Sequence, residues 1–206
     1  VNVNTLLATN HRIERVEANE FDLKNPGLGQ VVNLGAINAK SAYLIGRDVL
    51  NAGKITSSNG SIGLVAASDV RVSFDAAGLL TATIVADDVL GTVTNTGTLD
   101  AGERGRIDLK ASASEEIVAS TINNDATSAS ALISENGVLK LVNNSGEIKG
   151  KSVSLSAEPN GRVSVSGIIS ADNTSGTGGL VTITGKEVTL EAGATITATG
   201  YSGGGK

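Results

Sequence analysis

Two pairs of adjacent acidic residues, Asp87-Asp88 and Glu115-Glu116, are the side chains whose types best suit acid–base chemistry. Paired carboxylates cleave glycosidic bonds when one acts as an acid and the other as a base or nucleophile. Neighbours on a β-strand point to opposite faces, so neither pair forms such a site by itself. We therefore favour solvated loop charges, and an acidic site would need carboxylates gathered from different parts of the fold.

The single histidine, His11, lies in the polar stretch Thr9-Asn-His-Arg12. No neighbouring group in this stretch would orient it as a general base, so we expect a solvent-exposed side chain. The chain has no cysteine, which excludes disulfides and thiolate metal sites, and one histidine cannot supply a multi-histidine site. The sequence therefore predicts no bound metal and no cofactor.

Glycine-rich and aromatic residues offer no clear binding site either. The run Gly176-Thr-Gly178-Gly179 precedes a strand pattern rather than a helix, so we expect turns and not a phosphate-binding loop. The two tyrosines, Tyr43 and Tyr201, are too few for a sugar-binding groove, and Tyr43 falls in the strand-like stretch Ala42-Tyr-Leu-Ile45. We predict no catalytic residues and do not expect an enzyme.

Charge and hydropathy exclude two further classes of function. The net charge is −5 with both signs interspersed, so the chain has no basic patch and nucleic acid is not an expected partner. No apolar run approaches the roughly 20 residues that a membrane-spanning helix requires. Valine, isoleucine and threonine favour strands, and the 26 glycines favour turns.

The elements that position these residues are indicated by a recurring motif, Asn-x-Gly-x-Ile-x-Ala, followed by a short alternating strand. Each copy has an asparagine, a glycine two residues later and a branched aliphatic residue two residues after that. The four clear copies contain Asn33, Gly35 and Ile37; Asn51, Gly53 and Ile55; Asn95, Gly97 and Leu99; and Asn144, Gly146 and Ile148. A unit repeated at this length predicts a solenoid, in which each coil stacks on its neighbours.

The spacing of the aliphatic positions sets the expected coil length. Ile37 and Ile55 are 18 residues apart, whereas Ile55 and Leu99 are 44 residues apart, which we interpret as two coils of 22. Short alternating strands between the motifs would place one face inside and one outside. We predict an all-β, right-handed parallel β-helix of roughly nine coils, with the motif asparagines stacked as an amide ladder.

Two regions are expected to depart from regular coils. Residues 1–30 should form a strand and then an extrahelical excursion, and residues 31–206 a continuous parallel β-helix. Near residues 112–130 the regular spacing of alternating strands is lost, and an extra loop or short helical turn is expected there. Capping units of the kind that solenoids need are not visible at either end, so both ends look truncated.

Several passages resemble the filamentous-haemagglutinin-like exoproteins of two-partner secretion in Gram-negative bacteria. Residues 1–9 are similar to the stretch that follows the Asn-Pro-Asn-Gly signature of their secretion domain, and residues 41–55, 60–75 and 105–124 are similar to its later coils. The signature itself is absent, and Asn25-Pro26-Gly27 does not replace it. The fragment therefore corresponds to the later part of the secretion domain and following coils.

The resemblance implies a secreted or cell-surface protein, exported through an outer-membrane pore-type transporter that the missing N-terminal region would engage. The leading hypothesis is a rigid β-helical rod for surface display and adhesion, with a host or neighbouring-cell surface as partner. The alternative is a self-associating extracellular fibre or matrix subunit that binds itself end to end. A carbohydrate-active β-helix enzyme ranks last, because the outward positions are mostly threonine, serine, asparagine and scattered charges.

Overall fold

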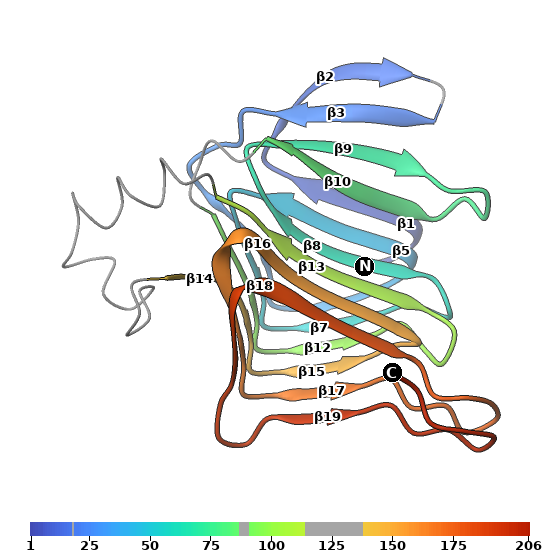
Figure 1. The fold of residues 1–206 in the computed structure, drawn as a ribbon. Helices are drawn as coiled ribbons and strands as arrows, with labels where there is room; N and C mark the ends of the chain where they lie inside the picture. The colour runs from blue at the N-terminus through green and yellow to red at the C-terminus, as the bar shows by residue number, and fades with distance from the viewer. Residues whose placement is uncertain (18, 87–90, 114–137) are drawn as a thin grey trace.

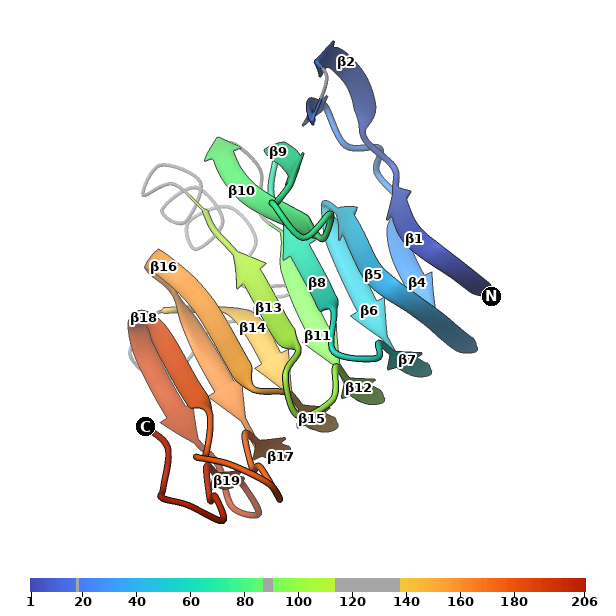
Figure 2. The ribbon, with the colours of Figure 1, turned by 90° about the vertical axis from the view of Figure 1, so that its right-hand side faces the viewer.

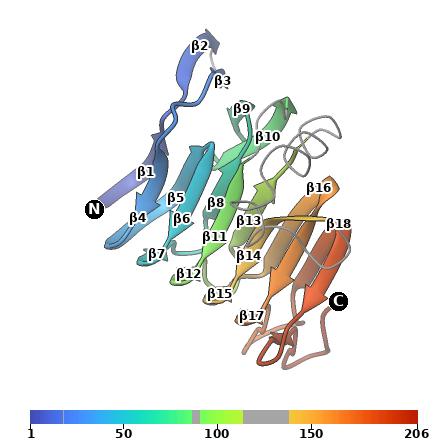
Figure 3. The same ribbon diagram turned by 90° about the vertical axis from the view of Figure 1, so that its left-hand side faces the viewer.

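The structure is a computed structural model, and it describes residues 1–206 except for residue 18, residues 87–90 and residues 114–137. The described residues form strands and turns and contain no helix. Most strands are parallel and lie in three stacks, through which the chain winds coil after coil (Figure 1). The predicted parallel β-helix is confirmed. Figures 2 and 3 show the coils in sequence order, from the blue N-terminal end to the red C-terminal end.

The three stacks are named here A, B and C in the order in which the chain visits them. Stack A contains β4 (Gln30–Asn33), β6 (Asp48–Asn51), β11 (Thr92–Asn95), β14 (Leu139–Asn144) and the second halves of β16 (Ser152–Val165) and β18 (Leu180–Leu190). Stack B contains the start of β5 (Ala36–Gly46), β7 (Lys54–Thr56), β12 (Thr98–Asp100), β15 (Glu147–Lys149), β17 (Ile168–Ser170) and β19 (Thr195–Thr197). Stack C contains β1 (Asn2–Thr9), the end of β5, β8 (Ser61–Ala66), β13 (Arg106–Ala111) and the first halves of β16 and β18.

Each stack holds six strands among the described residues, so the expectation of roughly nine coils is wrong. Leu99 of β12 pairs directly with Ile55 of β7, which makes the 44 residues between them one coil and not two. The extra length leaves the solenoid as the hairpin of β9 (Asp69–Phe74) and β10 (Leu80–Ala86). The β9–β10 hairpin therefore departs from the regular coils within residues 31–206. Period-two alternation could not reveal this, because parallel and antiparallel strands share it.

A second sheet lies against stack C and is called the antiparallel sheet below. The hairpin of β2 (Arg12–Glu17) and β3 (Glu20–Lys24) leaves the solenoid after β1, and β3 pairs with β9. The strand order is β10-β9-β3-β2, so two excursions that are distant in sequence share one sheet. In Figure 1 these four strands lie side by side at the top of the molecule.

The solenoid core consists of columns of identical or similar side chains that the register places above one another. In stack B the column runs through Ile37, Ile55, Leu99, Ile148 and Ile169, all buried. In stack A it consists of valines alone: Val31, Val49, Val93, Val142, Val163 and Val188. Burying one such side chain contributes about 1.5–3 kcal/mol, and no single coil could bury its own apolar face.

Candidate functional site

The four motif asparagines form a continuous amide ladder inside stack A. Asn33 Nδ2 donates to Oδ1 of Asn51, Asn51 Nδ2 to Oδ1 of Asn95, and Asn95 Nδ2 to Oδ1 of Asn144, each over 2.8 Å. The last three side chains are fully buried. The column continues as Val165, so the hydrogen-bonded run ends after Asn144. These residues satisfy one another and offer no free group to a ligand.

The motif glycines are required by close packing between coils. A Cβ on Gly97 would lie 2.0 Å from the carbonyl oxygen of Gly53, and one on Gly146 would lie 2.1 Å from that of Gly97. The same contact occurs between Gly53 and Gly35, whereas a Cβ on Gly35 would meet nothing within 4 Å. Backbone atoms of the preceding coil therefore exclude a side chain at every motif glycine except the first.

The chemistry-bearing side chains that the fold does gather lie at the seam between the antiparallel sheet and stack C. An apolar cluster fills this seam, built around the fully buried Tyr43 of β5. Its other buried members come from both layers: Leu23, Ile45, Val65, Ala67, Val70, Val72, Leu80 and Ala82. Tyr43 is thus a core residue, and its ring is not available to stack on a sugar.

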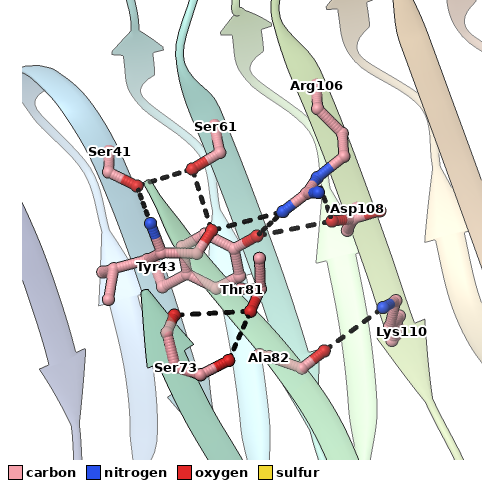
Figure 4. A network of polar contacts seen from close by, with 10 residues as sticks. Ser41, Tyr43, Ser61, Ser73, Thr81, Ala82, Arg106, Asp108 and Lys110 are labelled. Atoms are coloured by element: carbon pink, nitrogen blue, oxygen red, sulfur yellow. Dashed lines mark hydrogen bonds and ion pairs between the residues drawn. The ribbon is translucent and has the colours of Figure 1, made fainter. Parts of the chain in front are cut away.

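Tyr43 is the centre of a polar network that crosses from β5 to β13 (Figure 4). Its hydroxyl donates to Oδ2 of Asp108 over 3.3 Å and accepts from Nη2 of Arg106 over 3.3 Å. Arg106 Nε also lies 3.0 Å from Asp108 Oδ2. Burial, reinforced by the Asp108 charge, raises the pKa of Tyr43 to about 12. The phenol therefore stays protonated at neutral pH and serves as a structural link, not as a general base.

The same network fastens β10 to the solenoid (Figure 4). The Leu80 N–H donates to Ser41 Oγ over 2.8 Å, and the Leu80 carbonyl accepts from Ser61 Oγ over 3.0 Å. The two serine hydroxyls are themselves 2.5 Å apart. Further along the strand, Lys110 Nζ donates to the Ala82 carbonyl over 3.2 Å. Polar groups on stack C thus bond the backbone of a strand that would otherwise have one unpaired edge.

His11 is buried, with 8% of its surface exposed, so the expected solvent-exposed side chain is wrong. Its Nε2 lies 3.0 Å from the Ala67 carbonyl oxygen, and its Nδ1 lies 3.1 Å from Thr9 Oγ1. Burial lowers the pKa of the imidazole. His11 is buried because it lies where β1 leaves the solenoid, against the point where β8 does the same.

The outer face of the antiparallel sheet carries charges of both signs. Arg71 of β9 donates from Nε to Asp22 Oδ1 of β3 over 2.8 Å, and the same atom lies 4.0 Å from Glu20. Hydrogen bonding and attraction to Asp22 raise the pKa of Arg71. This pairing joins the two excursions on the solvent side, as the apolar cluster joins them on the inner side.

The remaining predicted positions fall outside the described residues or towards the C-terminal end of the solenoid. Asp87-Asp88, Glu115-Glu116 and most of the expected insert near 112–130 lie outside the described residues. Tyr201 is exposed near the C-terminal end. The run 176–179 joins β17 to β18, and a Cβ on Gly178 or Gly179 would lie 2.1 Å from a backbone oxygen.

Metal-binding and membrane-spanning features are absent from the part of the chain that the structure describes. In those residues, no three histidine, aspartate or glutamate side chains gather closely enough to hold a metal ion. In the same residues, no helix is long and apolar enough to cross a membrane. Two grooves have volumes of about 580 and 460 Å³ and are lined by strand ends and glycine turns at the two ends of the solenoid.

Sequence reasoning missed the seam, although it had a signal for it. The stretches at β5 and β8 are apolar at consecutive positions, including Ala42 to Ile45 and Leu64 to Ala67. Such runs indicate strands buried on both faces. A solenoid wall with solvent outside buries one face only, so these runs pointed to a second covering layer.

The chain was compared with protein-family models, curated proteins and solved structures, and a resemblance was found only among the solved structures. No protein-family model matches the sequence, and no curated protein matches it significantly. Among solved structures, the crystal structure of the HMW1 secretion domain from Haemophilus influenzae superposes with a TM-score of 0.67 at 24% sequence identity. The match covers 97% of this chain and 49% of that chain, so this chain spans about half its length. At this identity the likeness shows a shared fold.

Proposed function

We propose that this chain is a segment of a secreted exoprotein of the two-partner secretion type. The observation that carries the proposal is the likeness to the HMW1 secretion domain over 97% of the chain. The stretches at 41–55, 60–75 and 105–124, which resemble the filamentous-haemagglutinin-like members, support the same assignment. On this proposal the partner in export is an outer-membrane pore-type transporter, and the protein acts outside a Gram-negative cell.

Within that role we propose a rigid rod for surface display and adhesion. Six strands per stack at a spacing of about 4.8 Å give a shaft of about 24 Å in these coils. Aliphatic columns, the amide ladder and the second layer at the seam all resist bending between coils. The described polar clusters satisfy one another, which suits a scaffold better than a catalyst.

Export is tested in the native context of the full open reading frame. The protein is expressed in a Gram-negative host with and without its companion pore protein, and its amount in the medium and in the periplasm is measured. We expect at least a tenfold loss from the medium without the pore protein. Equal amounts in the medium under both conditions would contradict the two-partner route. A pore-protein variant that inserts but is closed serves as the matched control.

Adhesion is tested separately with the purified chain on beads. Beads carrying the folded chain should bind host or neighbouring cells more than beads carrying the variant Ile148→Asp, which disrupts a fully buried column. Equal binding by both would show that the folded rod does not mediate attachment. Release of sugar from a polysaccharide, abolished by one point substitution, would instead favour a carbohydrate-active enzyme.

A self-associating fibre subunit is the second candidate, favoured by apolar residues that are exposed at both ends of the solenoid. Val32 and Leu34 lie on the first coil, and Val188, Leu190 and Ile196 lie on the last. Strand edges beside these residues resemble templates for pairing with another copy. Sedimentation velocity and electron microscopy over a range of concentrations test this. Filaments that lengthen with concentration support it, and single short rods throughout contradict it.

A further inference from the structure

The antiparallel sheet ends in an edge strand on each side, and the solenoid fastens only one of these edges. The outer edge of β10 is bonded by side chains of stack C, as at Leu80 and Ala82. β2 pairs with β3 alone, and no other described strand pairs with it. β2 is the uppermost strand in Figure 1, and Figures 2 and 3 show it standing clear of the coils. Its outer edge is therefore open to another strand.

Two apolar residues of β2 lie on the inner face of this sheet and are exposed. Ile13 is opposite the buried Leu23, and Val16 is opposite Phe21, which packs against the apolar cluster. Directly opposite side chains share a face of the sheet. A register shift between Ile13 and Arg15 places two residues that are three positions apart on this one face. Ile13 and Val16 are 54% and 75% exposed, so the apolar face extends past the part that the solenoid covers.

The backbone groups of the same two residues point to the open edge. The Phe74 N–H of β9 donates to the Asn19 carbonyl over 3.0 Å, so every second residue of β3 from there onwards, including Phe21, faces β9. Val16 and Ile13 are opposite residues of β3 that face β9. They therefore direct their N–H and C=O groups away from β3, where another strand can bond them.

The two ends of β2 carry charges of opposite sign. Arg12, at its start, is opposite Lys24 of β3, and the two cations share the carboxylate of Glu14. Glu17, at its end, is opposite Glu20. The guanidinium on β9 that approaches this second end is shared with a further carboxylate. Like charges directly opposite each other are destabilising, so each end favours an opposite charge from outside the chain.

We propose that the open edge of β2 binds β2 of a second copy of this chain, in antiparallel orientation about a two-fold axis. Reversal about the middle of β2 brings Ile13 of each copy opposite Val16 of the other, and Arg12 opposite Glu17. The outward backbone groups, the exposed apolar residues and the opposite charges all meet in this one arrangement. The two four-stranded sheets then form a single sheet across the dimer.

This contact closes at two copies, because a two-fold axis uses the same edge on both. It therefore differs from the end-to-end filaments considered above, and it does not depend on export by two-partner secretion. An edge of six residues makes a small interface, and small interfaces are transient. We expect a dissociation constant on the order of 100 µM.

Sedimentation equilibrium over a range of concentrations tests the dimer with charge reversals. Arg12→Glu and Glu17→Arg each create two like-charged pairs by symmetry and should raise the dissociation constant about tenfold or more. The double variant Arg12→Glu/Glu17→Arg, and an equal mixture of the two single variants, regain opposite charges and should return it to within about threefold. Lys54→Glu, on the exposed surface of β7, makes the same charge change away from this edge and is the matched control.

Amide exchange reports on the backbone contact without any variant. Protection of the Ile13 and Val16 amides should rise with protein concentration, whereas that of Leu99 in β12 should stay constant. Val16→Lys, which places a charge opposite Ile13 of the other copy, should abolish this rise and leave the circular dichroism spectrum unchanged. A chain that stays monomeric up to about 1 mM would overturn the proposal. So would a dimer that forms equally well in Arg12→Glu, Glu17→Arg and the unmodified chain, because its contact then lies elsewhere.

Discussion

The side-chain amide of Asn51 donates a 2.8 Å hydrogen bond to Oδ1 of Asn95, 44 residues later in the chain. The bond identifies these 44 residues as a single coil with an excursion, because only stacked neighbours lie within hydrogen-bonding distance. The hydrogen bonds of the flanking pairs Asn33–Asn51 and Asn95–Asn144 have the same length, although the paired residues are 18 and 49 positions apart in the chain. The ladder therefore fixes register across excursions of different size.

Substitution within the ladder should depend on position. Asn95→Ala removes two ladder bonds, leaves the Asn51 amide only its 3.4 Å bonds to the Gly53 and Thr98 carbonyls, and takes the ladder donor from the buried Asn144 carbonyl group, at a cost of about 2–4 kcal/mol. Asn33→Ala, at the end of the ladder, removes one ladder bond and two longer bonds with Gly35 that lie nearer the solvent, and should cost about 1 kcal/mol. Urea unfolding monitored by circular dichroism measures both. Equal losses in the two variants would show that the ladder does not act as a connected run.

Glycine substitution offers a matched pair in the same motif. Gly97→Ala places a Cβ 2.0 Å from the Gly53 carbonyl oxygen, so the coils must move apart. We expect destabilisation of about 1–3 kcal/mol or more from this overpacking. Gly35→Ala meets no atom within 4 Å and should change the unfolding free energy by less than about 0.5 kcal/mol. A stable Gly97→Ala variant with unchanged thermal midpoint would contradict the close stacking of these turns.

The repeat itself predicted the architecture because its chemistry is local and periodic. Gly35, Gly53 and Gly97 recur where the backbone of one coil touches the next, and the asparagines recur where the ladder runs. Such positions tolerate few other residue types, so the motif can be recognised in the sequence alone. The stacking of Ile37 on Ile55 followed directly from the motif, whereas the stacking of Ile55 on Leu99 did not, because the spacing of 44 residues suggested two coils.

The seam could not be predicted in the same way, because it joins excursions that have no repeat. Nothing near Asp22 indicates that it pairs with Arg71, 49 residues later, on a neighbouring hairpin. His11 lies in a polar stretch, and it is buried against Ala67, 56 residues later. The alternation of Val70 and Val72 fits a solenoid strand as well as a hairpin strand. Burial at these sites depends on tertiary placement, which the local pattern does not contain.

The hydrogen bonds to Leu80 give a local prediction. Ser41→Ala removes the acceptor of the buried Leu80 N–H, and the serine has no other role in the core than this bond and its contact with Ser61. We expect a loss of about 1–3 kcal/mol, confined to the β9–β10 hairpin. Amide exchange should show faster opening at Leu80 and unchanged protection at Leu99. A change spread evenly over the solenoid would contradict a local fastening role.

Ionisation of Tyr43 provides the last prediction. The phenol has a pKa of about 12 in the folded protein and about 10 when unfolded, so above pH 10 the unfolded state releases its proton first. Stability supplied by the neutral phenol is thus complete below pH 10 and falls between pH 10 and 12, by about 2–3 kcal/mol in total.

In Tyr201→Phe the remaining tyrosine is Tyr43, and its absorbance at about 295 nm should rise only near pH 12. Tyr43→Phe keeps the ring in the apolar cluster and should abolish this part of the alkaline destabilisation. Ionisation of Tyr43 near pH 10 in the folded Tyr201→Phe variant would show that Arg106 stabilises the phenolate more strongly than burial opposes it, because the two act in opposite directions on this hydroxyl.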